Sequence, residues 1–389
     1  LCKLSQMPPP FSLLVCSRVG RLLPKPPSPA DLPVHLQYPQ LPYPATYSTS
    51  RTRQVGQILR HGAHQWKVEK CIYSGPFSDV FVIADTTAPS RKYAMKVERV
   101  NGVARPVLKL DAHVLPLLKG RAGFPQLVVS GRTASFKYCV MQLVGPDLSK
   151  LRKVMPAGRF SLPTALNIAH QTLSSLEHLH NSGWLCRDVK APNLAVGRGA
   201  DAATVYMLDF GFARRFLNKD NKYRAQRPTA PLLGTMPYAS LAAHCRKEQC
   251  PRDDIESWWY MIVEFVMGAL PWSYMPKDTI LEYKQHIRMA GHREFFAKLP
   301  PAFAAMLTVI DRTGFYDRPD YDHLRFLLHS AAATEKVDMN SVLDWMANPV
   351  LYTKAEKLGE DVTEVPCAAE QSQHSEHGSV RDLAPPAAV

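Results

Sequence analysis

The stretch that decides the fold is Cys186-Arg187-Asp188-Val189-Lys190-Ala191-Pro192-Asn193, and Asp209-Phe210-Gly211 follows it. The first segment carries a carboxylate, an ammonium group and an amide within one short loop, and the second segment adds another carboxylate. Transfer of a phosphoryl group from a metal-bound nucleotide needs an acceptor for the proton of the substrate hydroxyl, a cation near the moving group and oxygen ligands for Mg²⁺. A short polar cluster of this kind is usually a solvated turn, so other parts of the sequence are needed to distinguish such a turn from a catalytic loop.

A lysine far upstream supplies the missing part of the pattern. Lys96 ends Tyr93-Ala94-Met95-Lys96, a segment with the character of a β-strand. Together with the D-x-K-x-x-N loop and D-F-G, it resembles the protein kinases. The resemblance implies an α+β, bilobal fold with a small β-rich N-terminal lobe and a larger helical C-terminal lobe. It further implies that Asp188 is the catalytic base, that Lys190 holds the γ-phosphoryl group, that Asn193 and Asp209 bind Mg²⁺, and that Lys96 bridges the α- and β-phosphates of ATP.

Hydrophobic periodicity along the chain is consistent with this fold. Alternating apolar residues predict strands at residues 66–72, 80–84, 93–97, 127–129 and 138–141. The spacing of apolar residues predicts a helix at 107–118, and after residue 145 the pattern becomes mainly helical. Further helices are expected at 162–180, 254–266, 279–290, 301–310 and 321–332, with a short strand at 206–208 leading into Asp209.

The resemblance becomes narrower in the second half of the chain. Residues 234–240, which we call the substrate-docking segment, read Gly-Thr-Met-Pro-Tyr-Ala-Ser, whereas typical eukaryotic kinases end this segment in Ala-Pro-Glu. With Arg252-Asp253-Asp254 and Leu270-Pro271-Trp272, it resembles the casein kinase 1 superfamily, in which Asp254 would hydrogen-bond the backbone of the catalytic loop. The segments that favour its tau-tubulin kinase branch are Val107-Leu108-Lys109-Leu110, Val140-Met141-Gln142-Leu143, residues 206–211 and Lys298-Leu299-Pro300-Pro301.

The nucleotide site departs from the family pattern in its phosphate-covering loop. Of the three glycines expected there, only Gly75 is present, and Tyr73 and Ser78 occupy the outer positions. Side chains at those positions limit the approach of the backbone to the phosphates. For the adenine ring, the resemblance implies Ala94 as a cap, Met141 as the gatekeeper and Leu143 as the hydrogen-bonding position of the hinge.

Two further departures concern the helix partner of Lys96 and the catalytic loop. Asp111 replaces the usual glutamate and is one methylene shorter, and Cys186 replaces the usual histidine. Because every group closest to the chemistry is retained, we favour an active ATP-dependent protein serine/threonine kinase. A kinase-fold scaffold with little or no turnover remains an alternative, and a small-molecule phosphotransferase is less consistent with the substrate-docking segment.

The charge of the chain bears on its partners. The formal net charge is +13 over 389 residues, which favours acidic or phosphorylated protein substrates. By the resemblance, Arg227 holds an anion near the acceptor site, and Arg214 and Arg215 add charge beside it. We find no aromatic-basic motif for nucleic acid and expect none as a partner. We also expect a monomer.

Composition divides the chain into three parts. Residues 1–55 are rich in proline and predict a disordered leader, and residues 346–389 predict a disordered tail. Between them we place the kinase domain at 60–345, with an N-terminal lobe at 60–143 and a C-terminal lobe at 147–345. The eight scattered cysteines favour a reducing, intracellular compartment, cytoplasm or nucleus. The longest apolar run is too short to span a membrane.

Overall fold

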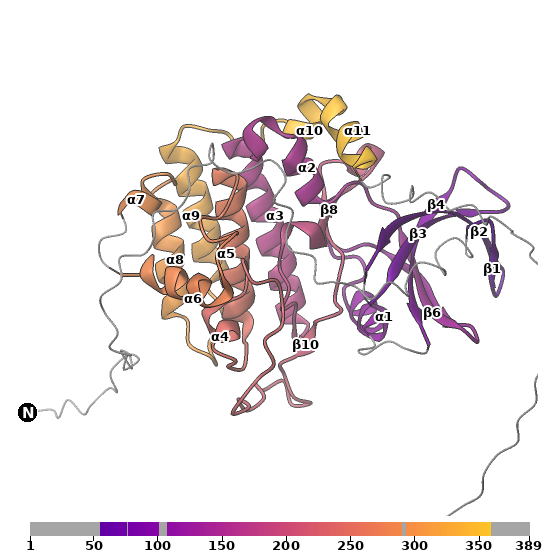
Figure 1. Cartoon of the computed structure of the whole chain (residues 1–389), viewed down its shortest axis with the longest axis horizontal. Coiled ribbons are helices and arrows are strands. Elements are labelled where there is room, and N and C mark those ends of the chain that lie inside the picture. The colour runs from indigo at the N-terminus through magenta and orange to yellow at the C-terminus, as the bar shows by residue number, and fades with distance from the viewer. Residues whose placement is uncertain (1–54, 76, 101–106, 290–292, 359–389) are drawn as a thin grey trace, which may run out of the picture.

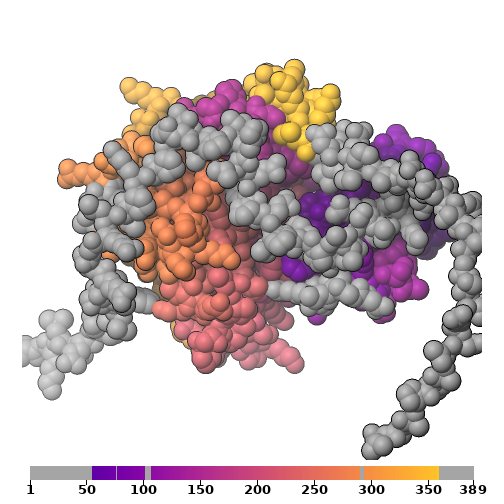
Figure 2. Space-filling view, in the orientation of Figure 1, coloured from indigo at the N-terminus to yellow at the C-terminus, as the bar shows by residue number. Residues whose placement is uncertain are grey.

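The computed structural model describes residues 55–75, 77–100, 107–289 and 293–358, which form two lobes (Figure 1). The N-terminal lobe is an antiparallel sheet with one helix packed against it, and the C-terminal lobe is mainly helical. In Figure 2 the violet surface of the sheet lies at the right and the red and orange surface of the helices lies to its left. The predicted α+β, bilobal fold is confirmed.

The sheet of the N-terminal lobe has six strands in the order β1-β2-β3-β4-β6-β5. Its buried face is supplied by alternating apolar positions, for example Trp66 and Val68 on β2 and Met95 and Val97 on β4. The helix α1 packs on β4, β5 and β6, which places its buried face beside the middle of β4. The elements of this lobe are β1 (Ile58–His61), β2 (His64–Ser74), β3 (Asp79–Asp85), β4 (Lys92–Arg99), α1 (Leu108–Leu117), β5 (Leu127–Arg132) and β6 (Phe136–Gln142).

The core of the C-terminal lobe forms around α3 and α5. Helix α5 begins with a capping box, in which the Cys250 amide donates to the Asp253 carboxylate at 2.8 Å, and it ends at Gly268 in a left-handed conformation with φ of 90°. Trp258 is fully buried between the two helices and donates to the Ala169 carbonyl at 3.2 Å. The helices of this lobe are α2 (Leu148–Val154), α3 (Leu162–Asn181), α4 (Leu241–His244), α5 (Pro251–Met267), α6 (Lys277–His286), α7 (Arg293–Phe296), α8 (Ala302–Arg312), α9 (Tyr321–Thr334), α10 (Asp344–Ala347) and α11 (Pro349–Lys357).

Short strands frame the loops that carry the motif residues. A 3₁₀ turn at Ala191–Asn193 leads directly into β8, so Asn193 is held at the start of a paired strand. Strand β9 pairs with β8 and leads into Asp209. The four strands are β7 (Trp184–Leu185), β8 (Leu194–Val196), β9 (Val205–Met207) and β10 (Arg214–Arg215), and they pair as β8 with β9 and β7 with β10.

The structure corrects both edges of the predicted domain. The sheet begins at β1, before residue 60, because a four-residue strand is too short to give a periodic signal. The predicted disordered tail begins too early, because α11 packs on α2 and buries Ala355. The Tyr352 hydroxyl of α11 also donates a hydrogen bond to the Gly197 carbonyl at 3.0 Å. The predicted leader, apart from Val55, and residues 359–389 lie outside the described residues. No helix in the described ranges is long and apolar enough to cross a membrane.

Candidate active site

Lys96 lies at the centre of a charge cluster between the lobes, in which Lys96 and Asp111 are buried and Asp209 is partly exposed. Its Nζ atom is 2.7 Å from Asp111 Oδ2 on α1 and 3.0 Å from Asp209 Oδ1. The other oxygen of Asp111 accepts a hydrogen bond from the Phe210 amide at 3.0 Å. The shorter aspartate therefore reaches Lys96 directly, with no bridging water required, and it also fixes the backbone after Asp209.

The cluster changes the protonation equilibria of its members. Burial raises the pKa of Asp111 to about 6, against the opposing attraction of Lys96. Burial also opposes the charge of Lys96, but Asp111 and Asp209 together hold the pKa of Lys96 above its usual range. The pKa of Asp209 is lowered: burial opposes this shift, and Lys96 and the Gly211 amide cause it. Lys96 and Asp209 are therefore charged at neutral pH.

The catalytic loop forms a second cluster around Asp188, which is 6% exposed. Lys190 Nζ is 2.7 Å from Asp188 Oδ2, and the Asn193 side-chain amide donates to the same oxygen at 3.1 Å. Thr235 Oγ1 donates to Asp188 Oδ1 at 2.9 Å and accepts from Lys190 Nζ at 2.8 Å. Thr235 belongs to the substrate-docking segment, but its contact with Asp188 depends on the fold and could not be predicted from the sequence alone.

A buried network from α5 holds the conformation of this loop. Asp254 accepts the backbone amides of Cys186 and Arg187, each at 2.7 Å, so the predicted contact with the loop backbone is confirmed. Arg187 has φ of 65°, a strained conformation for a residue with a side chain. His180, which sequence reasoning did not single out, places its Nε2 atom 2.8 Å from the same carboxylate, which accepts a hydrogen bond from it. A side chain at Gly234 would meet the Arg187 carbonyl, so this glycine allows the substrate-docking segment to approach the loop.

The oxygen donors fit a magnesium ion. Asn193 uses its amide nitrogen to contact Asp188, which leaves its side-chain oxygen as a metal ligand. Asp209 Oδ1 already accepts hydrogen bonds from Lys96 Nζ and from the Gly211 amide, which leaves Oδ2 as a metal ligand. Two side-chain oxygens are too few to enclose Mg²⁺, so substrate phosphates and water would have to complete its octahedron.

The predicted adenine-site residues are adjacent in the structure. Ala94 on β4 and Met141 on β6 are register partners, and both are buried. Leu143 follows β6 and is half-buried. Their proposed roles as cap, gatekeeper and hinge remain predictions.

The phosphate-covering loop joins β2 to β3, as predicted. The Tyr73 ring lies against Gly75, where an added Cβ would collide with it. Phe77 makes an edge contact with Phe212, with ring centroids 6.2 Å apart, so the tip of the loop reaches the segment after Asp209. Tyr73 therefore occupies space on the loop that would be open in a relative with three glycines.

Two of the three predicted anion-site arginines come together. Arg227 pairs with the buried carboxylate of Glu248, and Arg214 Nε is 3.2 Å from the same carboxylate. Burial opposes the ionisation of Glu248, but Arg227 and Arg214 hold its pKa below its usual value. Arg215 follows Arg214 on β10 and therefore points to the opposite side, where it is exposed. Sequence reasoning missed Glu248, since nothing local distinguishes it from a surface glutamate.

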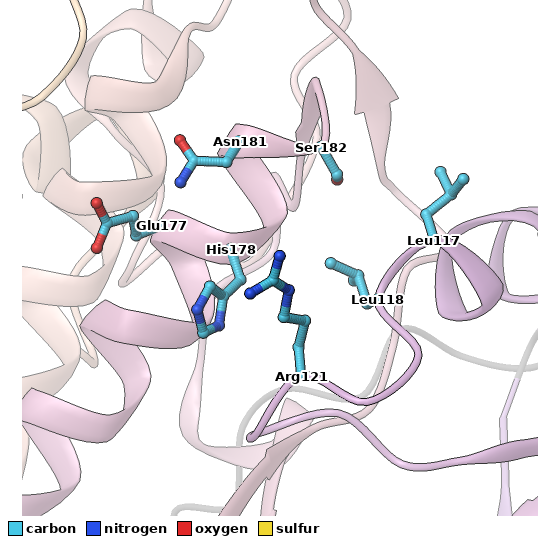
Figure 3. Close-up of a pocket in the computed structure, with 7 residues that line it drawn as sticks. All are labelled: Leu117, Leu118, Arg121, Glu177, His178, Asn181 and Ser182. Carbon is cyan, nitrogen blue, oxygen red and sulfur yellow. The ribbon is translucent and has the colours of Figure 1, made fainter.

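A pocket of about 460 Å³ lies away from this chemistry, between the ends of α1 and α3 (Figure 3). Arg121 points toward His178 in it, and Leu117 and Leu118 line the opposite side. Burial and Arg121 lower the pKa of His178. None of the predicted site residues lines this pocket.

The lysine–aspartate cluster, the Asp188 loop and the two lobes define a protein kinase. The protein kinase domain family matches residues 67–319, and the chain belongs to that family. Among curated proteins, serine/threonine-protein kinase spe-6 of Caenorhabditis elegans is 51% identical over 314 residues, which cover 79% of this chain and 83% of the relative. A probable serine/threonine-protein kinase of Dictyostelium discoideum is 33% identical over 283 residues, which cover 72% of this chain and 56% of the relative. The chain is a protein serine/threonine kinase.

Proposed function

We propose that the chain is a kinase of casein kinase 1 type, nearest the tau-tubulin kinase branch, that phosphorylates acidic or previously phosphorylated proteins with Mg-ATP. The observation that carries the catalytic part is the triangle of Asp188, Lys190 and Thr235, in which each side chain contacts the other two. The direct Lys96–Asp111 pair supports it further, because an active kinase requires this link between strand and helix. We place the protein inside the cell, in the cytoplasm or nucleus, as a monomer.

The geometry supports in-line transfer to a serine or threonine hydroxyl. Asp188 orients the hydroxyl and accepts its proton as the oxygen attacks the γ-phosphorus, while the bond to the β,γ-bridging oxygen breaks and ADP leaves. Lys190 stabilises the negative charge of the moving phosphoryl group, and Lys96 binds the α- and β-phosphates. A magnesium ion held by Asn193 and Asp209 would neutralise phosphate charge.

The arginine pair supports the choice of acidic substrates. Two guanidinium groups share the single carboxylate of Glu248, so one positive charge is in excess. Arg227 contacts this carboxylate through two nitrogens, with Nη2 3.0 Å from Glu248 Oε1. We propose that a substrate carboxylate or phosphate is held by these arginines in the same way as the chain's own Glu248 carboxylate.

The test compares matched peptides that carry aspartate, phosphoserine or asparagine N-terminal to one acceptor serine. We expect the aspartate and phosphoserine peptides to react about fivefold faster, as one partly exposed ion pair allows, and the difference to shrink with salt. Arg227→Ala should remove the preference, and Glu248→Gln should enlarge it because it frees both arginines. Arg318→Ala, which removes an exposed arginine paired with Glu177, is the matched control.

Equal rates for all three peptides would remove the acidic preference from the proposal. That result would leave the catalytic assignment standing, since Arg227 does not contact Asp188 in any described interaction. Absence of transfer to every peptide would instead support the scaffold alternative.

A further inference from the structure

Lys284 on α6 is a fully buried lysine that the chemistry described above does not use. Its Nζ donates to the Ala239 carbonyl at 2.6 Å and to the Met236 carbonyl at 3.1 Å, and it lies 3.3 Å from His244 Nε2. The ring of Tyr260 covers it, with the nitrogen 4.3 Å from the ring centroid. The side chain is thus enclosed and faces two backbone carbonyls.

Burying an amine here has a cost that needs an explanation. Among the described residues no carboxylate lies within ion-pairing distance of Lys284, and burial lowers the pKa of Lys284 well below its usual range. A hydrocarbon side chain would fill the same space without that cost. What the lysine contributes is its N–H donors, and two of these suffice for the carbonyls whether the amine is charged or neutral.

Both carbonyls belong to the substrate-docking segment. A third carbonyl between them, that of Pro237, accepts from Trp272 Nε1 at 2.8 Å. The residue immediately before Met236 is Thr235, which contacts Asp188 and Lys190. A continuous chain of hydrogen bonds and backbone therefore runs from α6 to the catalytic loop.

We propose that Lys284 is a positioning residue that sets the substrate-docking segment, and through it Thr235, against the catalytic loop. It performs the anchoring that a segment without the usual Ala-Pro-Glu ending must obtain elsewhere. Lys284 itself touches no reacting atom. The inference rests on the protein kinase activity. It does not rest on the preference for acidic substrates, because α6 does not contribute to the group formed by Arg214, Arg227 and Glu248.

The test is Lys284→Met, which keeps the length of the side chain and removes its donors. We expect kcat/KM for the fastest available peptide to fall at least tenfold, as for loss of a group that aligns the acceptor, while the Kd for ATP stays within about twofold. Arg252→Met is the matched control, since it removes a half-buried cation that holds the Thr313 carbonyl at 3.0 Å on another part of the lobe. It should lower the unfolding midpoint without changing kcat/KM for the peptide.

A double-mutant cycle with Thr235→Ala separates positioning from general stability. If Lys284 acts through Thr235, Lys284→Met should have a much smaller effect on peptide kcat/KM in the Thr235→Ala background. Additive effects of the two substitutions on kcat/KM for the peptide would overturn the proposal. A fall in kcat/KM no larger than that of Arg252→Met, at an equal loss of stability, would overturn it as well. Should Lys284→Met fail to fold, Trp272→Phe, which removes the hydrogen bond to the Pro237 carbonyl and truncates a buried ring that packs on Tyr260 and Phe295, must still raise KM for the peptide and leave the Kd for ATP unchanged. Trp272→Phe with a parental KM would overturn the proposal as well.

Discussion

Lengthening Asp111 to the glutamate found in most kinases is expected to harm this protein. In the sequence alone, the short aspartate looks like a weak point, and Asp111→Glu would be expected to raise turnover. The structure reverses that expectation, because Asp111 already lies 2.7 Å from Lys96 and 3.0 Å from the Phe210 amide, and it is fully buried.

The size of the effect follows from these distances. One methylene adds about 1.5 Å, and 2.7 Å minus about 1.5 Å leaves about 1.2 Å between the carboxylate and Lys96, so α1 or the side chain must retreat. Overpacking of this kind costs about 1–3 kcal/mol of stability. If the displacement of Lys96 raises the activation free energy by a similar amount, kcat/KM for ATP falls about tenfold, since each 1.4 kcal/mol is a factor of ten.

The assay measures kcat/KM for ATP and the unfolding midpoint of Asp111→Glu beside the parent chain. Asp201→Glu adds the same methylene to an exposed carboxylate and serves as the control. Both quantities should fall in Asp111→Glu and neither should fall in Asp201→Glu. Higher turnover of Asp111→Glu with an unchanged midpoint would refute the reasoning.

Two further predictions concern the same site. Because the Tyr73 ring lies against Gly75, Tyr73→Gly with Ser78→Gly should tighten ATP binding and leave an adenine-site inhibitor nearly unaffected, as measured by calorimetry; equal gains for both ligands would contradict this account of the loop. Since the pKa of folded Asp111 is about 6, above the 3.8 of an ordinary aspartate, kcat/KM for ATP should fall as the pH drops through 6, where protonation breaks the Lys96 pair. The stability contributed by this group has the opposite sign and is lost as the pH rises from 3.8 to 6, so Asp111→Asn should flatten the stability profile in that range.

Sequence reasoning located the catalytic residues because their chemistry is encoded in short motifs. Asp188, Lys190 and Asn193 lie within one loop, so local spacing alone brings them together. Lys96 and Asp209 come from distant segments, and only the resemblance to a known fold placed them side by side.

Contacts that depend on long-range packing could not be predicted. Whether Asp111 reaches Lys96 depends on how closely α1 approaches the sheet, which is set by packing along the whole helix. Glu248 and Lys284 carry no motif, and their partners lie far from them in the sequence. The helix α11 was missed because its apolar side is short and only burial against α2 distinguishes it from a polar tail.

The most direct test of the central claim is transfer of labelled γ-phosphate from Mg-ATP to casein by the purified chain and by Asp188→Asn, with analysis of the phosphorylated residues. The account predicts label on serine or threonine with the parent chain. It predicts a loss of roughly 10²-fold or more in Asp188→Asn, with the unfolding midpoint and ATP affinity unchanged. No transfer by the parent chain, or parental rates in Asp188→Asn, would contradict it.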